Sequence, residues 1–516
     1  MPTNLHFTQK FAESIVAVLG CHDRVIFKGY LPFGRDEHLN GWVDHGLQIR
    51  RKDFLPWVEQ HSQALVDHAK QQAEQAGAPY HYLQGFHRKE QLIQGILRER
   101  RQDEGPVAVR CVMETCRTVK LLHGQGRPRL AFTRRPQRVL YYYFLDPDFG
   151  LMYVRLQTWF PCTIQVYVTG HEWLARQMAH KRWGCVQHDN AFTQLDDPAA
   201  AQRLANRFPK LPWVKVLHRW AQQVNPLLGE SWRGRADYYW VIDQAEYSTE
   251  VLFSSRAQLA ERYPRLLEHA LLRFSAQDIL TFLGRRLHPC CDGEVLTDCK
   301  TDRLPGARIK HRVKNNWLKM YDKFGQVLRI ETVINQPREF KVRRCRLRQG
   351  KRQMLWCPMH KGVANFYQSH AVARAANQRY LEALAVVDGP CATAQQLDRV
   401  CRPAKFPQRR RRGLKLLHPE EQRLFRAVLR GDWQLNGFRN RDLAHERYGP
   451  LPDRPEERRR RTVKVCRYLQ LLRAHGLLAK VPHSNRYRVT ANGEALFCSA
   501  VYLRLDAFPK ALKAVA

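Results

Sequence analysis

The sequence lacks any long uninterrupted apolar run. Its most apolar stretch, residues 139–145, ends at Asp146, whereas a membrane helix needs roughly 20 such residues. The first residues also lack a basic start followed by an apolar run and a small-residue site, so we expect no cleavable signal. These absences predict a protein with no membrane partner that stays in the cytoplasm.

Paired cysteine motifs are also scarce. The fourteen cysteines are scattered through the chain, which without an export signal predicts reduced thiols. Among the cysteines and histidines on either side of residues 317–334, only Cys357 and His360 have the two-residue spacing of zinc ligands, and the isolated pair Cys185 and His188 is attributed to chance. A zinc site remains the lesser alternative, with further ligands from Cys290, Cys291, Cys299 and Cys345.

Acidic residues are too few to balance the basic ones. Lys and Arg number 86 against 48 Asp and Glu, a formal net charge of +38. Self-repulsion of this size opposes compaction unless a polyanion neutralises it. Nucleic acid is the expected partner, which predicts a nucleoid-associated location. An anionic membrane is less favoured, because we find no clear basic amphipathic helix or acylation site.

The 516 residues are enough for three or four domains. Apolar residues recur at helical spacing in 53–101, and several β-rich segments follow one another in 105–170. We therefore expect an α+β multidomain protein with central antiparallel sheets and flanking helices. The expected units are a mostly helical domain 1–104, a mixed α/β domain 105–265, a basic hairpin-containing domain 266–400, a basic linker 401–413 and a C-terminal domain 414–516.

Aromatic, Arg and Gln side chains share a face in the last two of these strands. Tyr153, Arg155 and Gln157 alternate in one strand, and Gln165 and Tyr167 in the next. Such faces stack single-stranded bases and hold phosphates. A solvated antiparallel sheet face is the alternative.

A β-hairpin is predicted around Gly325, between the apolar segments 317–321 and 327–334. If Lys323 pairs with Gln326, then Lys319 faces Ile330, while Arg329 and Glu331 point to the other, polar face. Basic residues flank the hairpin, which suits a phosphate backbone. The hairpin is locally similar to one in replication initiators of phages and plasmids. The chain has no His-hydrophobic-His pair, so no nicking site is carried over.

Three acidic residues are candidates for holding magnesium. Asp23 heads an apolar strand, as the first metal-binding carboxylate does in RNase H-like nucleases. Asp243 and Glu246 lie in a second strand region but are three residues apart, so they face opposite ways unless the chain bulges. We expect Asp23, Asp243 and Glu331 to hold the ion and to be catalytic.

Residues 414–495 resemble a winged helix-turn-helix domain of the MarR-like sort. A helix from Pro419, a short helix at 440–444 and a long helix from Pro455 precede two short strands around a tip at 482–485. Val463, Val465, Leu469 and Leu472 are expected to point inward from the long helix. The resemblance implies DNA binding, with the long helix in the major groove and the wing beside it.

Together these features predict a nucleic-acid-binding protein of mobile-element or phage-like character, with DNA more favoured than RNA. We expect a magnesium-dependent DNA nuclease or recombinase; the alternative is a non-catalytic replication or transcription factor or ribonucleoprotein component. The residues expected to contact nucleic acid are Arg308, Lys310, Arg312, Lys314 and Arg329 around the hairpin, Arg409, Arg410 and Arg411 in the linker, and Arg458, Arg459, Arg460, Lys464, Arg467 and Arg486 in the C-terminal domain.

Overall fold

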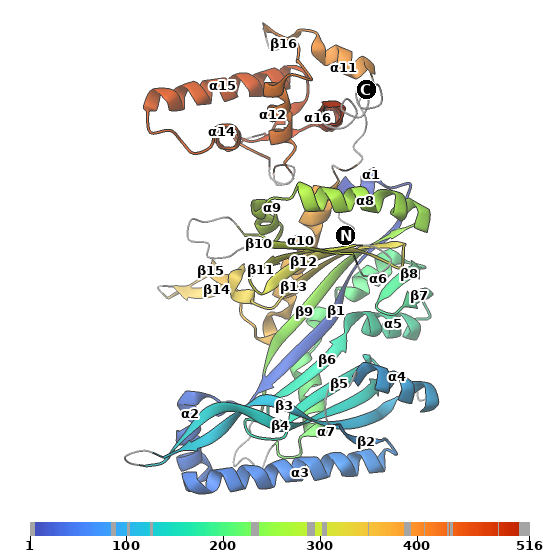
Figure 1. Cartoon of the computed structure of the whole chain (residues 1–516), viewed down its shortest axis with the longest axis vertical. Coiled ribbons are helices and arrows are strands. Elements are labelled where there is room, and N and C mark those ends of the chain that lie inside the picture. The colour runs from blue at the N-terminus through green and yellow to red at the C-terminus, as the bar shows by residue number, and fades with distance from the viewer. Residues whose placement is uncertain are drawn as a thin grey trace.

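A large sheet with helices packed around it forms the body of the protein (Figure 1). The computed structural model describes residues 6–83, 89–100, 104–123, 127–228, 237–285, 295–301, 307–348, 350–385, 387, 394–406, 408–430, 433, 437–482 and 484–504. Within these residues, eleven strands are joined in one sheet. The predicted central sheet with flanking helices is therefore confirmed.

The sheet has the strand order β10-β11-β12-β13-β9-β1-β6-β5-β4-β3-β2. In that order the strands are Val295–Lys300, Arg308–Val313, Asn316–Lys323, Val327–Ile334, Tyr239–Phe253, Ile15–Tyr30, Ile164–Thr169, Gly150–Gln157, Arg129–Asp146, Gly105–Leu122 and Tyr80–Leu83. β2 and β3 are parallel, and every other neighbouring pair among these strands is antiparallel. Segments 1–104, 105–265 and 266–400 thus share one sheet, and the segment expected to be mostly helical supplies its central strand, β1.

Helices cover the apolar face of the sheet. The helices around the sheet are α1 His6–Lys10, α2 Asp36–Gly41, α3 Phe54–Gln75, α4 Lys89–Arg100, α5 Gly170–His180, α6 Pro198–Ala205, α7 Trp213–Val224, α8 Arg256–Leu272, α9 Ala276–Phe282 and α10 Phe366–Leu384. Three apolar cores result: one around Phe27, Phe160 and Trp213, one around Ile330 and Tyr380, and a smaller one on the other face of β3 and β4, where Ile93 of α4 packs with Tyr141 and Tyr143. Because strand side chains alternate, the opposite face is free to carry polar groups.

The central strand β1 loses a neighbour partway along its length. β6 pairs with β1 only between Arg24 and Gly29. Beyond that point helices α5 and α6 lie beside the strand. The amide of Gln202 on α6 accepts a hydrogen bond from the Gly20 N–H at 2.7 Å and donates one to its carbonyl at 3.0 Å, which satisfies the strand edge.

The C-terminal elements are grouped apart from the sheet in Figure 1. They are α11 Ala394–Cys401, β16 Ala404–Phe406, β17 Arg409–Arg411, α12 Pro419–Val428, α14 Asn440–Tyr448, α15 Pro455–Ala474, β18 Leu478–Lys480, β19 Tyr487–Val489 and α16 Ala491–Tyr502. The helices and the two short strands lie where the sequence predicts them. Val465, Leu469 and Leu472 are buried, whereas Val463, expected inward, is 42% exposed. The predicted basic linker 401–413 contains a small hairpin, β16–β17.

Two further hairpins stand outside the large sheet. β7 Cys185–His188 pairs with β8 Ala191–Leu195, and β14 Lys341–Arg348 pairs with β15 Lys351–Pro358. Among the described helices, none combines the length and the apolar character needed to cross a membrane.

Candidate metal centre

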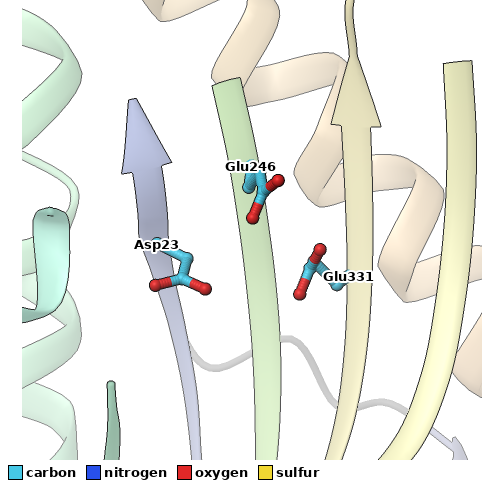
Figure 2. A group of neighbouring side chains, drawn as sticks. All are labelled: Asp23, Glu246 and Glu331. Atoms are coloured by element: carbon cyan, nitrogen blue, oxygen red, sulfur yellow. The ribbon is translucent and has the colours of Figure 1, made fainter. Parts of the chain in front are cut away.

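Three carboxylates meet on the polar face of the sheet. Asp23 comes from β1, Glu246 from β9 and Glu331 from β13, three neighbouring strands (Figure 2). One oxygen from each lies within 4.8 Å of the others. All three side chains are buried, with exposed fractions of 6%, 6% and 2%. In the described part of the chain, this is the one group of three or more His, Cys, Asp or Glu side chains close enough to share an ion.

The strand register accounts for the position of the two glutamates. Glu331 lies opposite Ser248, and Val333 lies opposite Glu246. Glu246 and Glu331 are therefore diagonal neighbours on one face, within reach of each other's side chains.

An irregularity in β1 places the aspartate. The pairing of β1 with β9 is regular from Ala17 to His22, which lies opposite Tyr247, and resumes with a shift at Val25 opposite Ala245. Asp23 lies in this shift, next to the point where β6 ends. Bulges of this kind redirect side chains and are common beside functional sites.

A buried arginine balances part of the negative charge. Arg329 is 0% exposed; its Nη2 lies 2.8 Å from Asp23 Oδ2 and its Nη1 lies 3.5 Å from Glu250 Oε1. Burial by itself disfavours the charged guanidinium, but Asp23 and the other nearby acids raise the pKa of Arg329 well above its usual range. Arg329, expected to contact nucleic acid, is thus enclosed in the protein and pairs with its own carboxylates.

A histidine and an asparagine complete the surroundings of Asp23. His171, at the start of α5, lies 2.9 Å from Glu250 through Nε2 and 3.6 Å from Asp23 through Nδ1. Asn190, in the β7–β8 turn, donates to both Asp23 oxygens at 2.8 and 2.6 Å. Burial raises the pKa of Asp23, but Arg329, His171 and Asn190 outweigh it and lower that pKa well below the usual value.

Glu331 has a lysine and a tyrosine as partners. The Lys319 ammonium is in direct contact with one oxygen, and the Tyr321 hydroxyl donates to the other at 2.8 Å. Both partners come from β12, where Lys319 lies opposite Glu331. This register differs by one residue from the prediction, which put Lys319 opposite Ile330. The slip moves Arg329 and Glu331 onto the face of Lys319.

Glu246 is the least compensated of the three. Its Oε1 accepts a hydrogen bond from Gln244 at 2.6 Å. No Lys, Arg or His nitrogen of the described residues lies within ion-pair distance of it. Burial and the repulsion of Glu331 raise its pKa. A divalent cation would relieve the repulsion of a buried carboxylate that has no ion-pair partner and lies beside two others.

Asp243 does not join the group. The pairing of β9 with β1 shifts between Gln244 and Ile242, so Asp243 is the extra residue of a bulge and is half-exposed. The chain does bulge here, yet Glu246 supplies the third carboxylate. The signal for Glu246 was available in the sequence, since both acids lie in the same strand region.

The donor set fits a hard cation. Carboxylate oxygens are the ligands that magnesium, manganese and calcium prefer, whereas zinc favours sulfur and imidazole. Cys357 and His360 belong to no group of three possible ligands in the portion of the chain that is described. The same holds for Cys299 and Cys345, whereas Cys290 and Cys291 lie outside the described residues.

Basic side chains continue along the same sheet face on both sides of the carboxylates. Lys310 lies opposite Lys319, and Arg312 lies opposite Trp317, so β11 presents both toward the face of Glu331. On the other side, Arg24 follows Asp23; burial lowers its pKa, but Glu246 and the neighbouring acids raise it overall. The residues exposed or half-exposed among those expected to contact nucleic acid are Arg308, Lys310, Arg312, Lys314, Arg409, Arg410, Arg411, Arg458, Arg459, Arg460, Lys464, Arg467 and Arg486.

Beyond Arg24 this face is hollowed into a groove of about 570 Å³. Its lining includes Lys28 and Arg134, together with three of the residues expected to hold single strands, Arg155, Gln157 and Gln165. Arg155 donates hydrogen bonds to Glu114 through Nε at 3.0 Å and Nη2 at 2.8 Å. Among the described residues, Lys28 and Arg134 form no such ion pair with a carboxylate. Tyr153 and Tyr167 stack on each other at 4.8 Å.

Comparison of the chain with family models, curated proteins and solved structures found no match. The function must therefore be argued from the site itself.

Proposed function

We propose that the chain is a metal-dependent nuclease or recombinase that acts on nucleic acid. The observation that carries the proposal is the group Asp23, Glu246 and Glu331, brought within 4.8 Å from three strands on a face flanked by Lys and Arg. Carboxylate clusters of this kind hold divalent cations, and flanking cations suit the phosphate backbone.

In this proposal, Asp23, Glu246 and Glu331 hold magnesium. When bound, magnesium stabilises charge on phosphoryl oxygens and supplies a hydroxide nucleophile. His171 and Asn190 fix the orientation of Asp23. We assign to Lys319, which is paired with Glu331, the stabilisation of the negative charge that develops on the scissile phosphate. Arg24 and Lys310 bind the phosphates on either side.

We further propose that the C-terminal segment is a winged helix-turn-helix that binds DNA. Its order of helices and its two-stranded wing support this, as do the exposed Arg458, Arg459, Arg460, Lys464 and Arg467 on α15. DNA is the favoured substrate for this reason. The mobile-element character remains part of the same proposal.

A second candidate is a binding protein with no catalytic centre. Asp23 is already paired with Arg329, and Glu331 with Lys319. A buried network of this composition is also compatible with a purely structural role, in which it fixes the register of the strands. Metal binding separates the two candidates, because a purely structural network takes up no ion.

The test compares Glu246→Gln with Asp243→Asn. We expect the wild type to bind Mn²⁺ in calorimetry and to cleave labelled DNA with Mg²⁺. We expect Glu246→Gln to lower the activity at least about 100-fold. Replacing a residue that only hydrogen-bonds to a metal ligand already lowers metal affinity or activity by about 10–100-fold. Asp243→Asn, on the same strand, stays within about twofold of the wild type. Equal activity of the two variants, or no ion uptake by the wild type, contradicts the catalytic proposal.

A further inference from the structure

The β14–β15 ribbon pairs with no other strand among the described residues. Figure 1 shows it projecting from the side of the body. Its base is anchored: Val342 and Cys357 are buried, and the Met359 N–H donates to the Phe340 carbonyl at 2.8 Å. The ribbon is therefore an ordered projection and not a loose end.

The ribbon carries charge of one sign only. Residues 341–358 contain seven Lys or Arg and no Asp or Glu. Of the cations, Arg344 donates to Gln368 on α10 at 3.1 Å, whereas Arg343, Arg346, Arg348 and Arg352 are exposed. No ion pair joins these four to an acid in the described parts of the chain. They are available to a polyanion.

The register separates the ribbon into two faces. Arg343 lies opposite Trp356, Cys345 opposite Met354 and Leu347 opposite Arg352. One face thus presents a row of large apolar side chains, Leu347, Met354 and Trp356, which are 72%, 54% and 67% exposed. Arg346 and Arg348 lie on the opposite face. Three such side chains in water on one small ribbon mark a binding surface.

We infer that this ribbon binds single-stranded nucleic acid, with Trp356 stacked on an unpaired base and the arginines on the phosphates. An aromatic platform set among cations is the arrangement that single strands require, because every base offers a π-face. Base pairs in a duplex are already stacked and offer Trp356 no such surface. The inference deepens the proposed function, on which it rests, by naming the strandedness of the substrate and a second contact site.

The experiment uses the full chain in chelator, so that binding is measured without cleavage. A labelled oligo(dT) and a duplex of equal length are titrated by fluorescence anisotropy. Trp356→Ala weakens oligo(dT) binding by about 5- to 140-fold, the equivalent of about 1–3 kcal/mol for one stacked base. Trp356→Phe keeps the ring and stays within about threefold of the wild type. Duplex binding changes by about twofold or less.

Two controls separate stacking from other causes. Leu272→Ala removes an equally exposed apolar side chain, 67% exposed on α8, and leaves both affinities unchanged. Arg343→Ala with Arg352→Ala, two exposed arginines on the face of Trp356, lowers the salt dependence of oligo(dT) binding by a slope of about 1.4, the value for two phosphate contacts on a single strand.

Failure of the inference differs from failure of the proposed function. If the wild type binds both nucleic acids and Trp356→Ala equals it, the ribbon inference is overturned while nucleic-acid binding stands. If the wild type binds neither but Trp356→Ala reduces binding to vesicles containing phosphatidylserine, the ribbon contacts a membrane and both are overturned. Ion uptake lost in Glu246→Gln tests the catalytic centre independently of either result.

Discussion

A fully buried guanidinium links the acidic strands. Arg329 reaches Asp23 on β1 and Glu250 on β9 from its own strand β13. Burying an ion pair costs desolvation free energy, and this cost is offset only while every charge has its partner. Arg329 is therefore required by the carboxylates around it, whether or not an ion is present.

Replacing Arg329 tests this dependence. We expect Arg329→Met to lower the free energy of unfolding by about 3–5 kcal/mol, because Asp23 and Glu250 lose their shared cation. Urea denaturation followed by tryptophan fluorescence measures the change. Arg50→Met is the matched control, since the Arg50–Asp53 pair is 74% and 46% exposed and such pairs are worth about 0–1 kcal/mol. If the two variants lower the free energy of unfolding equally, Arg329 does not stabilise the buried carboxylates as described.

The residue scale also shows what the sequence could predict. Asp23 and Glu331, both predicted from their places in apolar strands, have carboxylate oxygens within 4.8 Å of each other in the structure. The sequence predicts Asp243 rather than Glu246 as the third carboxylate, and this prediction depends on strict alternation of side chains along a strand. The bulges in β1 and β9 break that alternation. A bulge depends on the neighbouring strand, which the local sequence does not specify.

At the scale of elements, the β12–β13 hairpin depends on its turn. Lys323 pairs with Val327, which leaves Phe324, Gly325 and Gln326 in the loop. Phe324 and Gly325 both have positive φ, 60° and 76°. A loop with one more residue than predicted shifts the register by one, and a shift of one exchanges the faces. The hairpin itself was predictable, but its loop length was not.

Gly325→Ala tests the turn. We expect a loss of about 1–2 kcal/mol, since a Cβ is disfavoured in the left-handed region. A Cβ there would meet the Arg256 side chain only at 3.7 Å, so the loss is conformational and not a clash. Gly41→Ala, at the end of α2 with nothing within 4 Å of its Cβ, is expected to stabilise the protein by about 0.4–1 kcal/mol. Thermal denaturation checks both signs.

At the scale of the whole molecule, several histidines are buried in a protein rich in positive charge. Burial lowers the pKa of His311 and His370 to about 4. His311 contacts the Tyr380 hydroxyl at 3.0 Å, and His370 lies 3.2 Å from His22. Neutral histidines suit these sites because further cations nearby would add repulsion.

The pH dependence of stability follows from these shifts. The unfolded chain protonates its histidines near pH 6.5, and the folded chain protonates His311 and His370 only near pH 4. Between these values the unfolded state binds more protons, so stability falls as the pH falls, by about 1–3 kcal/mol for each histidine, and this histidine contribution levels off below about pH 4. His311→Gln reduces the loss between pH 7 and 4, whereas His81→Gln, at an exposed position, leaves it unchanged. Urea midpoints across this pH range provide the measurement.

The architecture as a whole was predictable only in outline. Apolar periodicity indicated a sheet with helices around it, but the strands were divided among three units. Pairings such as Arg24 with Thr169 and Arg329 with Glu250 join segments far apart in the chain, and no local pattern specifies them. The C-terminal segment, whose elements follow one another closely, matched its expected ranges.

The position of β1 has a consequence for how the protein is made. The central strand is synthesised long before Thr169 of β6 and Phe253 of β9, which pair with its two edges. During that interval an apolar strand with both edges open is exposed to other nascent chains. Synthesis of this protein therefore calls for a holding chaperone early in translation, and fragments that stop before β9 will aggregate.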